Sequence, residues 1–280
     1  MQCKITRTLL FIIPLLHTQI WGYQSVSIGA GYQLSYIPDV LNQYSSLVNY
    51  YYEKDDIDFS TNIFFHGLNP IFSPEAETAQ PNAGGASLAT GYFFNNNWYA
   101  GLDTSLAMGQ QNYRVFSAGI TSLVFLMDDL TTVSYLFAED TAYKFESYEQ
   151  NSLQSFSLLQ SVEYTIFDNL LASASMLINR QDYDAAFEIR RLYIIEPGFD
   201  MTWSAFRNLS INAGFGYGFR DDDTRYYRTG AILSYQYKGV SISTLFDYSK
   251  NLDDISAAIA RDTYQYSIDV QYRVWQNEKL

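Results

Sequence analysis

The chain has 280 residues and a formal net charge of −13, with 17% charged and 17% aromatic residues, among them 25 Tyr and 19 Phe. Its slightly negative mean hydropathy excludes a bundle of transmembrane helices. The acidic balance gives no basis for a nucleic-acid partner, and one cysteine with two histidines excludes a disulfide framework or a Cys/His metal site.

Residues 1–22 have the order of a secretory signal peptide, with Lys4 and Arg7 before a short apolar run. That run is too short to span a bilayer. We therefore expect a cleaved signal at 1–22 and one mature domain at 23–280. Cleavage would remove the only cysteine, Cys3, and would leave 15 basic residues against 30 acidic ones, a net charge of −15.

Nearly all of the mature chain alternates between apolar residues and small or polar ones, which is the period of a β-strand. The expected strands, in chain order, are 23–36, 57–65, 85–94, 98–108, 116–124, 131–137, 156–166, 170–178, 187–203, 209–219, 227–237, 240–248 and 264–274. Short turns separate several pairs, as at Lys238-Gly239. The connections at 138–152, 179–186 and 250–262 are longer and more polar.

The alternation is clearest in residues 206–219. One row is apolar: Leu209, Ile211, Ala213, Phe215, Tyr217 and Phe219. The opposite row is small and polar: Ser210, Asn212, Gly214, Gly216 and Gly218. Because this pattern recurs in strand after strand, the apolar rows are predicted to contact lipid. On 131–137 the predicted outer row is Thr131, Val133, Tyr135 and Phe137.

The number of strands depends on residues 40–52. Their apolar residues suit either a helix that begins at Asp39 or a strand that turns at 53–56 into 57–65. The first interpretation gives twelve strands and the second gives fourteen. Fourteen is favoured, because a structureless loop of nearly fifty residues is unusual in a compact domain.

The signal at 1–22, these hairpins and the final strand Tyr264–Trp275 together resemble bacterial (Gram-negative) outer-membrane β-barrel proteins. The resemblance covers nearly all of the mature chain and identifies no subfamily. It implies an all-β, antiparallel transmembrane barrel of 12–14 strands in the cell outer membrane, with short periplasmic turns and longer extracellular loops. It also implies contact with outer-membrane lipid and lipopolysaccharide, and with the barrel-insertion machinery during biogenesis. The oligomeric state is left open, and a secreted soluble β protein is the competing architecture.

The inward-facing rows carry the candidate functional residues. The candidates for the lumen lining are Asp103, Glu163, Arg190, Glu196, Asp200, Asn212, Arg228, Asp247, Asp269 and Arg273. Six acids against three bases predict a mild preference for cations if the lumen is open. Charges that pair across the barrel would instead close it. The leading hypothesis is a passive channel or porin for small hydrophilic solutes.

Two alternatives belong to other functional classes. A non-conducting structural or surface-interaction barrel would use the loops at 67–84 and 250–262 as an adhesin does. An outer-membrane hydrolase would use His66, the one histidine of the mature chain. The acidic cluster Asp221–Asp223 lacks the spacing of a calcium loop and is interpreted as solvated. No catalytic residue, metal site or cofactor is predicted, and the protein is not expected to be an enzyme.

Overall fold

The computed structural model describes residues 23–36, 40–70, 82–109, 113–143, 151–183, 191–253 and 262–277. The strands are β1 (Tyr23–Tyr36), β2 (Val40–Lys54), β3 (Ile57–Pro70), β4 (Ala83–Asn95), β5 (Trp98–Gly109), β6 (Arg114–Met127), β7 (Leu130–Tyr143), β8 (Asn151–Phe167), β9 (Leu170–Tyr183), β10 (Arg191–Phe206), β11 (Leu209–Arg220), β12 (Arg225–Tyr237), β13 (Val240–Asn251) and β14 (Asp262–Asn277). Within these residues, no helix is long and apolar enough to span a membrane.

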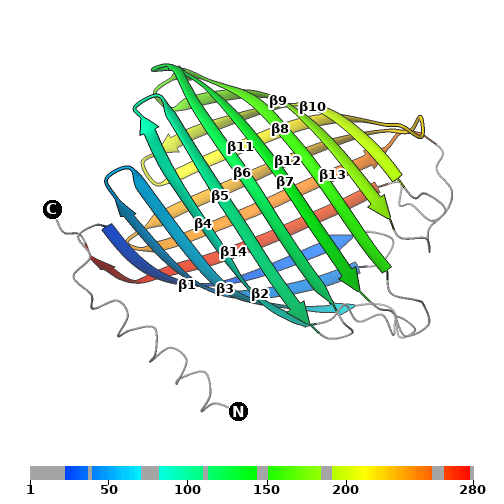
Figure 1. The fold of residues 1–280 in the computed structure, drawn as a ribbon, viewed down its shortest axis with the longest axis horizontal. Coiled ribbons are helices and arrows are strands. Elements are labelled where there is room, and N and C mark those ends of the chain that lie inside the picture. Colours follow the sequence, from blue (N-terminus) through cyan, green and yellow to red (C-terminus); the bar gives the residue numbers. More distant parts are fainter. Residues whose placement is uncertain are drawn as a thin grey trace, which may run out of the picture.

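The strands form one closed antiparallel barrel in which each strand pairs with its neighbours in sequence and β1 pairs with β14 (Figure 1). The predicted count of fourteen is confirmed, and β2 is a strand rather than a helix. Closure of the barrel explains why residues 40–54 form a strand. Every strand finds a partner on both sides, so no row of backbone N–H and C=O groups is left unpaired in a lipid environment.

Short turns gather at one end of the barrel, beside the start of β1 and the end of β14 (Figure 1). Six two-residue connections lie there, and in the last of them Lys238 and Gly239 both have positive φ, as hairpin turns of type I′ require. At the opposite end β7, β9 and β13 extend to Tyr143, Tyr183 and Asn251. The strand ladder therefore continues into polar residues that the sequence assigned to the long connections.

The outer face is apolar over most of its height. Exposed large side chains occur on almost every strand, for example Leu102, Ile120, Leu158, Ile195 and Phe246. Near the short-turn end, Phe94 stacks on Trp98 with ring centroids 4.4 Å apart. Exposed aliphatic residues with aromatic residues near the ends are the outer surface that a bilayer selects in a barrel.

The prediction for β7 was wrong about which face its side chains occupy. Leu136 is 52% exposed and pairs with Ile120 and Leu158 on the outer face, whereas Tyr135 reaches Asp103 on the inner face. A register shift between Phe125 and Met127, just before the β6–β7 turn, explains the error. One extra residue in a β-bulge exchanges the two faces of the strand that follows.

Candidate functional site on the inner wall

The strands enclose space rather than a packed apolar core. Among the described residues, no large side chain is completely buried, and the buried apolar residues include three alanines, Ala83, Ala107 and Ala142. Buried polar residues include Ser117, Ser161 and Ser267 on the inner rows. A barrel of fourteen strands is wider than the eight-stranded barrels whose interiors are filled by side chains. The inner wall is therefore the candidate functional surface.

An acidic recess of about 290 Å³ lies on the inner faces of β9 to β13. Its charged residues are Glu196 and Asp200 on β10, Arg228 on β12 and Asp247 on β13. Small residues line the wall between them: Ser175, Gly198, Gly214, Gly216 and Gly230. We call this set the acidic recess. It carries three carboxyl groups and one guanidinium group.

Glu196 is the most enclosed charged residue of the recess, with 5% of its surface exposed. Its carboxylate accepts a hydrogen bond from the Tyr226 hydroxyl and lies 3.3 Å from the Arg228 guanidinium. Arg228 is half-exposed, so it faces both the carboxylate and the lumen. A buried carboxylate needs partners of this kind, because desolvation penalises an unpaired charge.

Glycine residues make this arrangement possible. The Tyr226 ring lies where a Cβ on Gly218 would stand, and the Glu196 carboxylate lies where a Cβ on Gly216 would stand. Larger residues on β11 would therefore separate Glu196 from Tyr226. The glycines of the small row predicted at 210–218 therefore leave the space in which Glu196 of β10 approaches Arg228 of β12.

Asp200 and Asp247 complete the negative side of the recess. Asp200 Oδ1 lies over Gly214, and Asp247 Oδ1 is 3.2 Å from the position of a Cβ on Gly230. Both side chains are partly exposed to the lumen. Farther toward the long-loop end, the Arg220 guanidinium lies 4.5 Å from the centroid of the Tyr226 ring and donates to Asn251.

A tyrosine reaches across a glycine to an acid at a second place on the wall. The Tyr135 hydroxyl of β7 donates to Asp103 Oδ1 of β5 at 3.2 Å, across Gly119 of β6. Its neighbours differ from those of Tyr226. Leu159 of β8 is the cross-strand partner of Tyr135, and Leu177 of β9 is the partner of Leu159. With Leu123, Val133 and Phe137, which share the inner rows of β6 and β7, these residues form the apolar inner patch.

The structure places nine of the ten predicted lumen residues on described strands. Five of them line the acidic recess: Glu196, Asp200, Asn212, Arg228 and Asp247. The other four lie apart on the inner rows: Asp103 on β5, Glu163 on β8, and Asp269 and Arg273 on β14. Arg190 lies outside the described residues. The predicted hairpins pair β10 with β11 and β12 with β13, but the alternation did not give the register that brings the charged residues of β10 and β12 together.

Two residues of the wall were absent from the sequence-based set. Tyr226 was missed because the expected strand began one residue later, although it shares its row with Arg228. Tyr135 was missed because the β6 bulge reversed the faces of β7. The even spacing between Tyr226 and Arg228 was the available signal for the first. No signal in the sequence located the bulge.

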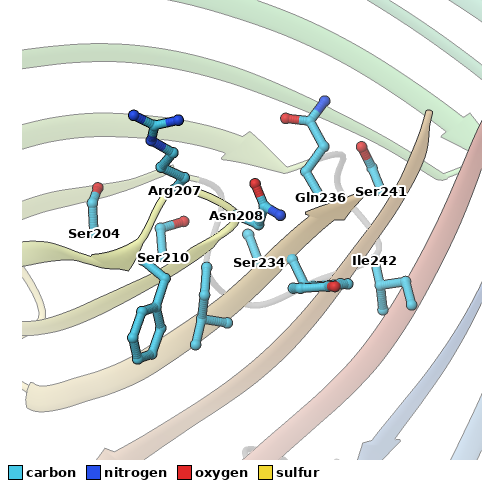
Figure 2. Close-up of a pocket in the computed structure, with 11 residues that line it drawn as sticks. Ser204, Arg207, Asn208, Ser210, Ser234, Gln236, Ser241 and Ile242 are labelled. Carbon is cyan, nitrogen blue, oxygen red and sulfur yellow. The ribbon is translucent and has the colours of Figure 1, made fainter. Parts of the chain in front are cut away.

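A second recess, of about 480 Å³, lies at the short-turn end between the β10–β11 and β12–β13 hairpins (Figure 2). Hydroxyl and amide side chains face it, among them Ser204, Ser210, Ser234 and Gln236, together with Arg207 of the β10–β11 turn. Arg207 is the one charged residue among those that line this recess, and Phe206, Leu209, Tyr235 and Ile242 also line it.

Within the described part of the chain, no group of three or more His, Cys, Asp or Glu residues is arranged to hold a metal ion. The backbone of His66 on β3 pairs with Ser45 of β2 and Ala83 of β4. Its side chain lies outside the described residues. A serine therefore lies opposite His66 in the strand ladder. A catalytic pairing of the two side chains stays a prediction.

No protein-family model matches the chain, and no curated protein matches it by sequence. Solved structures do match. A bacterial polysaccharide outer membrane secretin has a TM-score of 0.57 at 11% identity, over 90% of this chain and 98% of that one. The chain has the fold of bacterial outer-membrane β-barrels. The CymD monoaromatic hydrocarbon channel has a TM-score of 0.57 at 9% identity, over 89% and 88% of the two chains.

The Pseudomonas putida toluene transporter TodX has a TM-score of 0.50 at 9% identity, over 92% of this chain and 90% of that one. Identities this low support the architecture and select no subfamily. The closed antiparallel barrel and its apolar outer face agree with the expected place in the cell outer membrane. Residues 1–22 lie outside the described residues, so the signal peptide stays a prediction.

Proposed function

We propose that the barrel is a passive outer-membrane channel for small hydrophilic solutes, with a mild preference for cations. The acidic recess is the observation that carries this proposal, because three carboxyl groups and one guanidinium line it among four glycines, beside the apolar Ile232 and Leu245. Rings or clusters of acidic side chains raise the local concentration of cations in a pore. Structural similarity to proteins described as channels supports the same class of function.

Single-channel recording in planar bilayers tests the proposal. The purified protein should give stepwise conductance, and a salt gradient should give a reversal potential displaced toward that of the cation. Asp200→Asn with Asp247→Asn should reduce the displacement while the conductance steps persist. Silent bilayers that contain verified, inserted barrels would contradict a channel.

A channel for small aromatic solutes is the second candidate. The apolar inner patch favours it, since Tyr135 and Leu159 lie side by side on the inner wall and Leu177 follows on the next strand. CymD and TodX are described as monoaromatic hydrocarbon channels. Phe137→Ser should slow the entry of toluene into proteoliposomes and leave ionic conductance unchanged if this candidate is correct. An equal effect on both would favour a single hydrophilic path.

The two alternatives from the sequence remain proposals with their own tests. For a hydrolase, Ser45→Ala and His66→Ala should each abolish the release of fatty acid or peptide from a candidate substrate. Unchanged turnover in both variants would remove that version. For a surface-interaction barrel, exchange of the loops at 67–84 and 250–262, which lie largely outside the described residues, should abolish binding of a partner and preserve the fold.

A further inference from the structure

The two recesses of the inner wall both involve β10 to β13 and carry opposite charges. The acidic recess lies farther from the short turns and has three carboxyl groups and one guanidinium. The recess at the short-turn end has Arg207 as its one charged lining residue. Figure 2 shows Arg207 and Gln236 extending from one face of the sheet and Ile242 from the other. The wall of β10–β13 is therefore negative at one level and positive at another.

The negative level is shaped to receive a cationic group. From β10 to β13, the strand ladder at this level passes through Asp200, Gly214, Gly230 and Asp247. Each aspartate leans over the glycine next to it, so the two carboxyl groups approach each other across little more than one strand spacing, about 4.8 Å. Arg228, the one base of this recess, already contacts Glu196. An ammonium group has three N–H donors and can therefore bind both aspartates at once.

Polar and apolar side chains separate the two charged levels. On β10 and β11, Asn212 Nδ2 donates to Thr202 Oγ1 at 2.8 Å. The same row continues on β12 and β13 with Ile232 and Leu245. Toward the short turns follow hydroxyl and amide side chains, those of Ser204, Ser210, Ser234, Gln236 and Ser241. A peptide suits such a strip, because each of its residues has a backbone donor, a backbone acceptor and a side chain.

The separation of the charges sets the length of the ligand. Arg207 follows Asp200 by seven positions, and a rise of about 3.3 Å per residue places them roughly 20 Å apart along the wall. An extended peptide of about six residues spans the same distance. Its free amino and carboxyl groups then reach opposite charges at the two ends of the strip.

We propose that the inner wall of β10–β13 binds an extended oligopeptide of about six residues with both termini free. Its ammonium group lies between Asp200 and Asp247, and its carboxylate lies at Arg207. The amino terminus thus points away from the short turns. The inference rests on the proposed channel function and names the class of solute that the channel takes.

Block of the ionic current by added peptides tests the site. A hexapeptide of alanine and serine with free termini should interrupt the single-channel current. Acetylation of its amino terminus, or amidation of its carboxyl terminus, should shorten the residence time about tenfold, since each removes one charge-assisted contact. A free dipeptide should bind no better than the modified hexapeptides, because it cannot reach both charges. Equal residence times for the four peptides would overturn the proposal.

Variants assign each terminus to its partner. In Asp200→Asn with Asp247→Asn, acetylation of the hexapeptide should no longer change its residence time, while amidation should still do so. In Arg207→Gln the reverse should hold. A variant in which both modifications keep their full effect would overturn the assignment of the termini.

Two control variants carry the same changes in charge outside the recesses. Asp103→Asn with Asp269→Asn removes two inner-row acids on β5 and β14, and Lys238→Gln removes a base from the neighbouring short turn. Both controls should keep the effects of acetylation and amidation. Loss of these effects in the controls would overturn the proposal, because the peptide would then respond to the overall charge of the barrel.

Isothermal titration calorimetry of the folded barrel in detergent separates this proposal from that of the channel. Folding is checked by heat-modifiable migration on gels. A barrel that is silent in bilayers and still binds the free hexapeptide, with the same losses on acetylation and amidation, would contradict the channel and support the site. A conducting barrel that binds none of the peptides would overturn the site and leave the channel intact.

Discussion

The acidic recess and the apolar inner patch share one local arrangement of side chains but present different surfaces to the lumen. In both, a tyrosine crosses a glycine to reach an acid, through Tyr226 and Gly218 to Glu196 and through Tyr135 to Asp103. Around Glu196, further glycines leave the carboxyl groups of Asp200 and Asp247 partly exposed to the lumen. Around Tyr135, leucines cover the wall instead. The size of the neighbouring residues decides which part of the wall presents charge to a solute.

The substitution with the largest expected effect tests which side chains of β7 face lipid. The apolar inner patch depends on that assignment. Leu136→Arg places a charge against lipid near mid-height, and we expect a loss of about 2–4 kcal/mol of folding free energy. Phe137→Arg, one residue later, points into the lumen and should cost far less. Unfolding of the refolded protein in guanidinium chloride measures both. Equal losses would mean that the two faces are not distinguished as described.

A substitution among the β11 glycines of the acidic recess should have the next largest effect on stability. Gly218→Ala would place a methyl group inside the Tyr226 ring, and overpacking of this kind costs about 1–3 kcal/mol. Gly84→Ala on the outer row is the matched control, since its Cβ would be 3.6 Å from the nearest atom, the Phe64 carbonyl oxygen. Chemical denaturation compares the two variants. A control as destabilised as Gly218→Ala would contradict the claim that Gly218 leaves room for the Tyr226 ring.

Removal of the Arg228 guanidinium from the acidic recess should have a smaller effect on the free energy of unfolding. Arg228→Ala leaves Glu196 with Tyr226 as its hydrogen-bond donor, and we expect a loss of about 1 kcal/mol because Arg228 is half-exposed to water. A second change, Glu196→Gln, should recover most of that loss, since a neutral amide oxygen still accepts from Tyr226. The double variant is compared with each single variant by the same unfolding measurement. No recovery would show that the pair does not couple.

The smallest effect belongs to an ion pair outside both regions. Arg225 at the start of β12 binds Asp253 with Nη2 2.8 Å from Oδ1, and the guanidinium holds the pKa of the Asp253 carboxyl below its usual value. The lowered pKa makes the stabilisation fully present above about pH 4, and it is lost as the pH falls through the folded-state pKa. Asp253→Asn should therefore differ slightly from wild type in its denaturation midpoint at neutral pH and not at low pH. A difference that grows on acidification would contradict this assignment.

The sequence predicted the strands well because alternation with period two is a local property, and the apolar row of 209–219 needed no tertiary information. It also predicted the small row beneath the recess. It could not place Glu196 beside Arg228, which lies 32 positions later, because only the register of three strands brings them together. The inverted faces of β7 followed from one extra residue at Leu126, whose effect on the following strand is invisible to a pattern of hydrophobicity.

The reversal potential of single channels tests the central claim most directly, that the acidic recess faces an open lumen and sets its selectivity. With a salt gradient across a planar bilayer, the wild type should be modestly cation-selective. Asp200→Asn combined with Asp247→Asn should bring the ratio of cation to anion permeability close to one, and Leu159→Ser in the apolar inner patch should leave it unchanged. Selectivity for anions in the wild type, or an unaltered ratio after both aspartates are neutralised, would contradict the account.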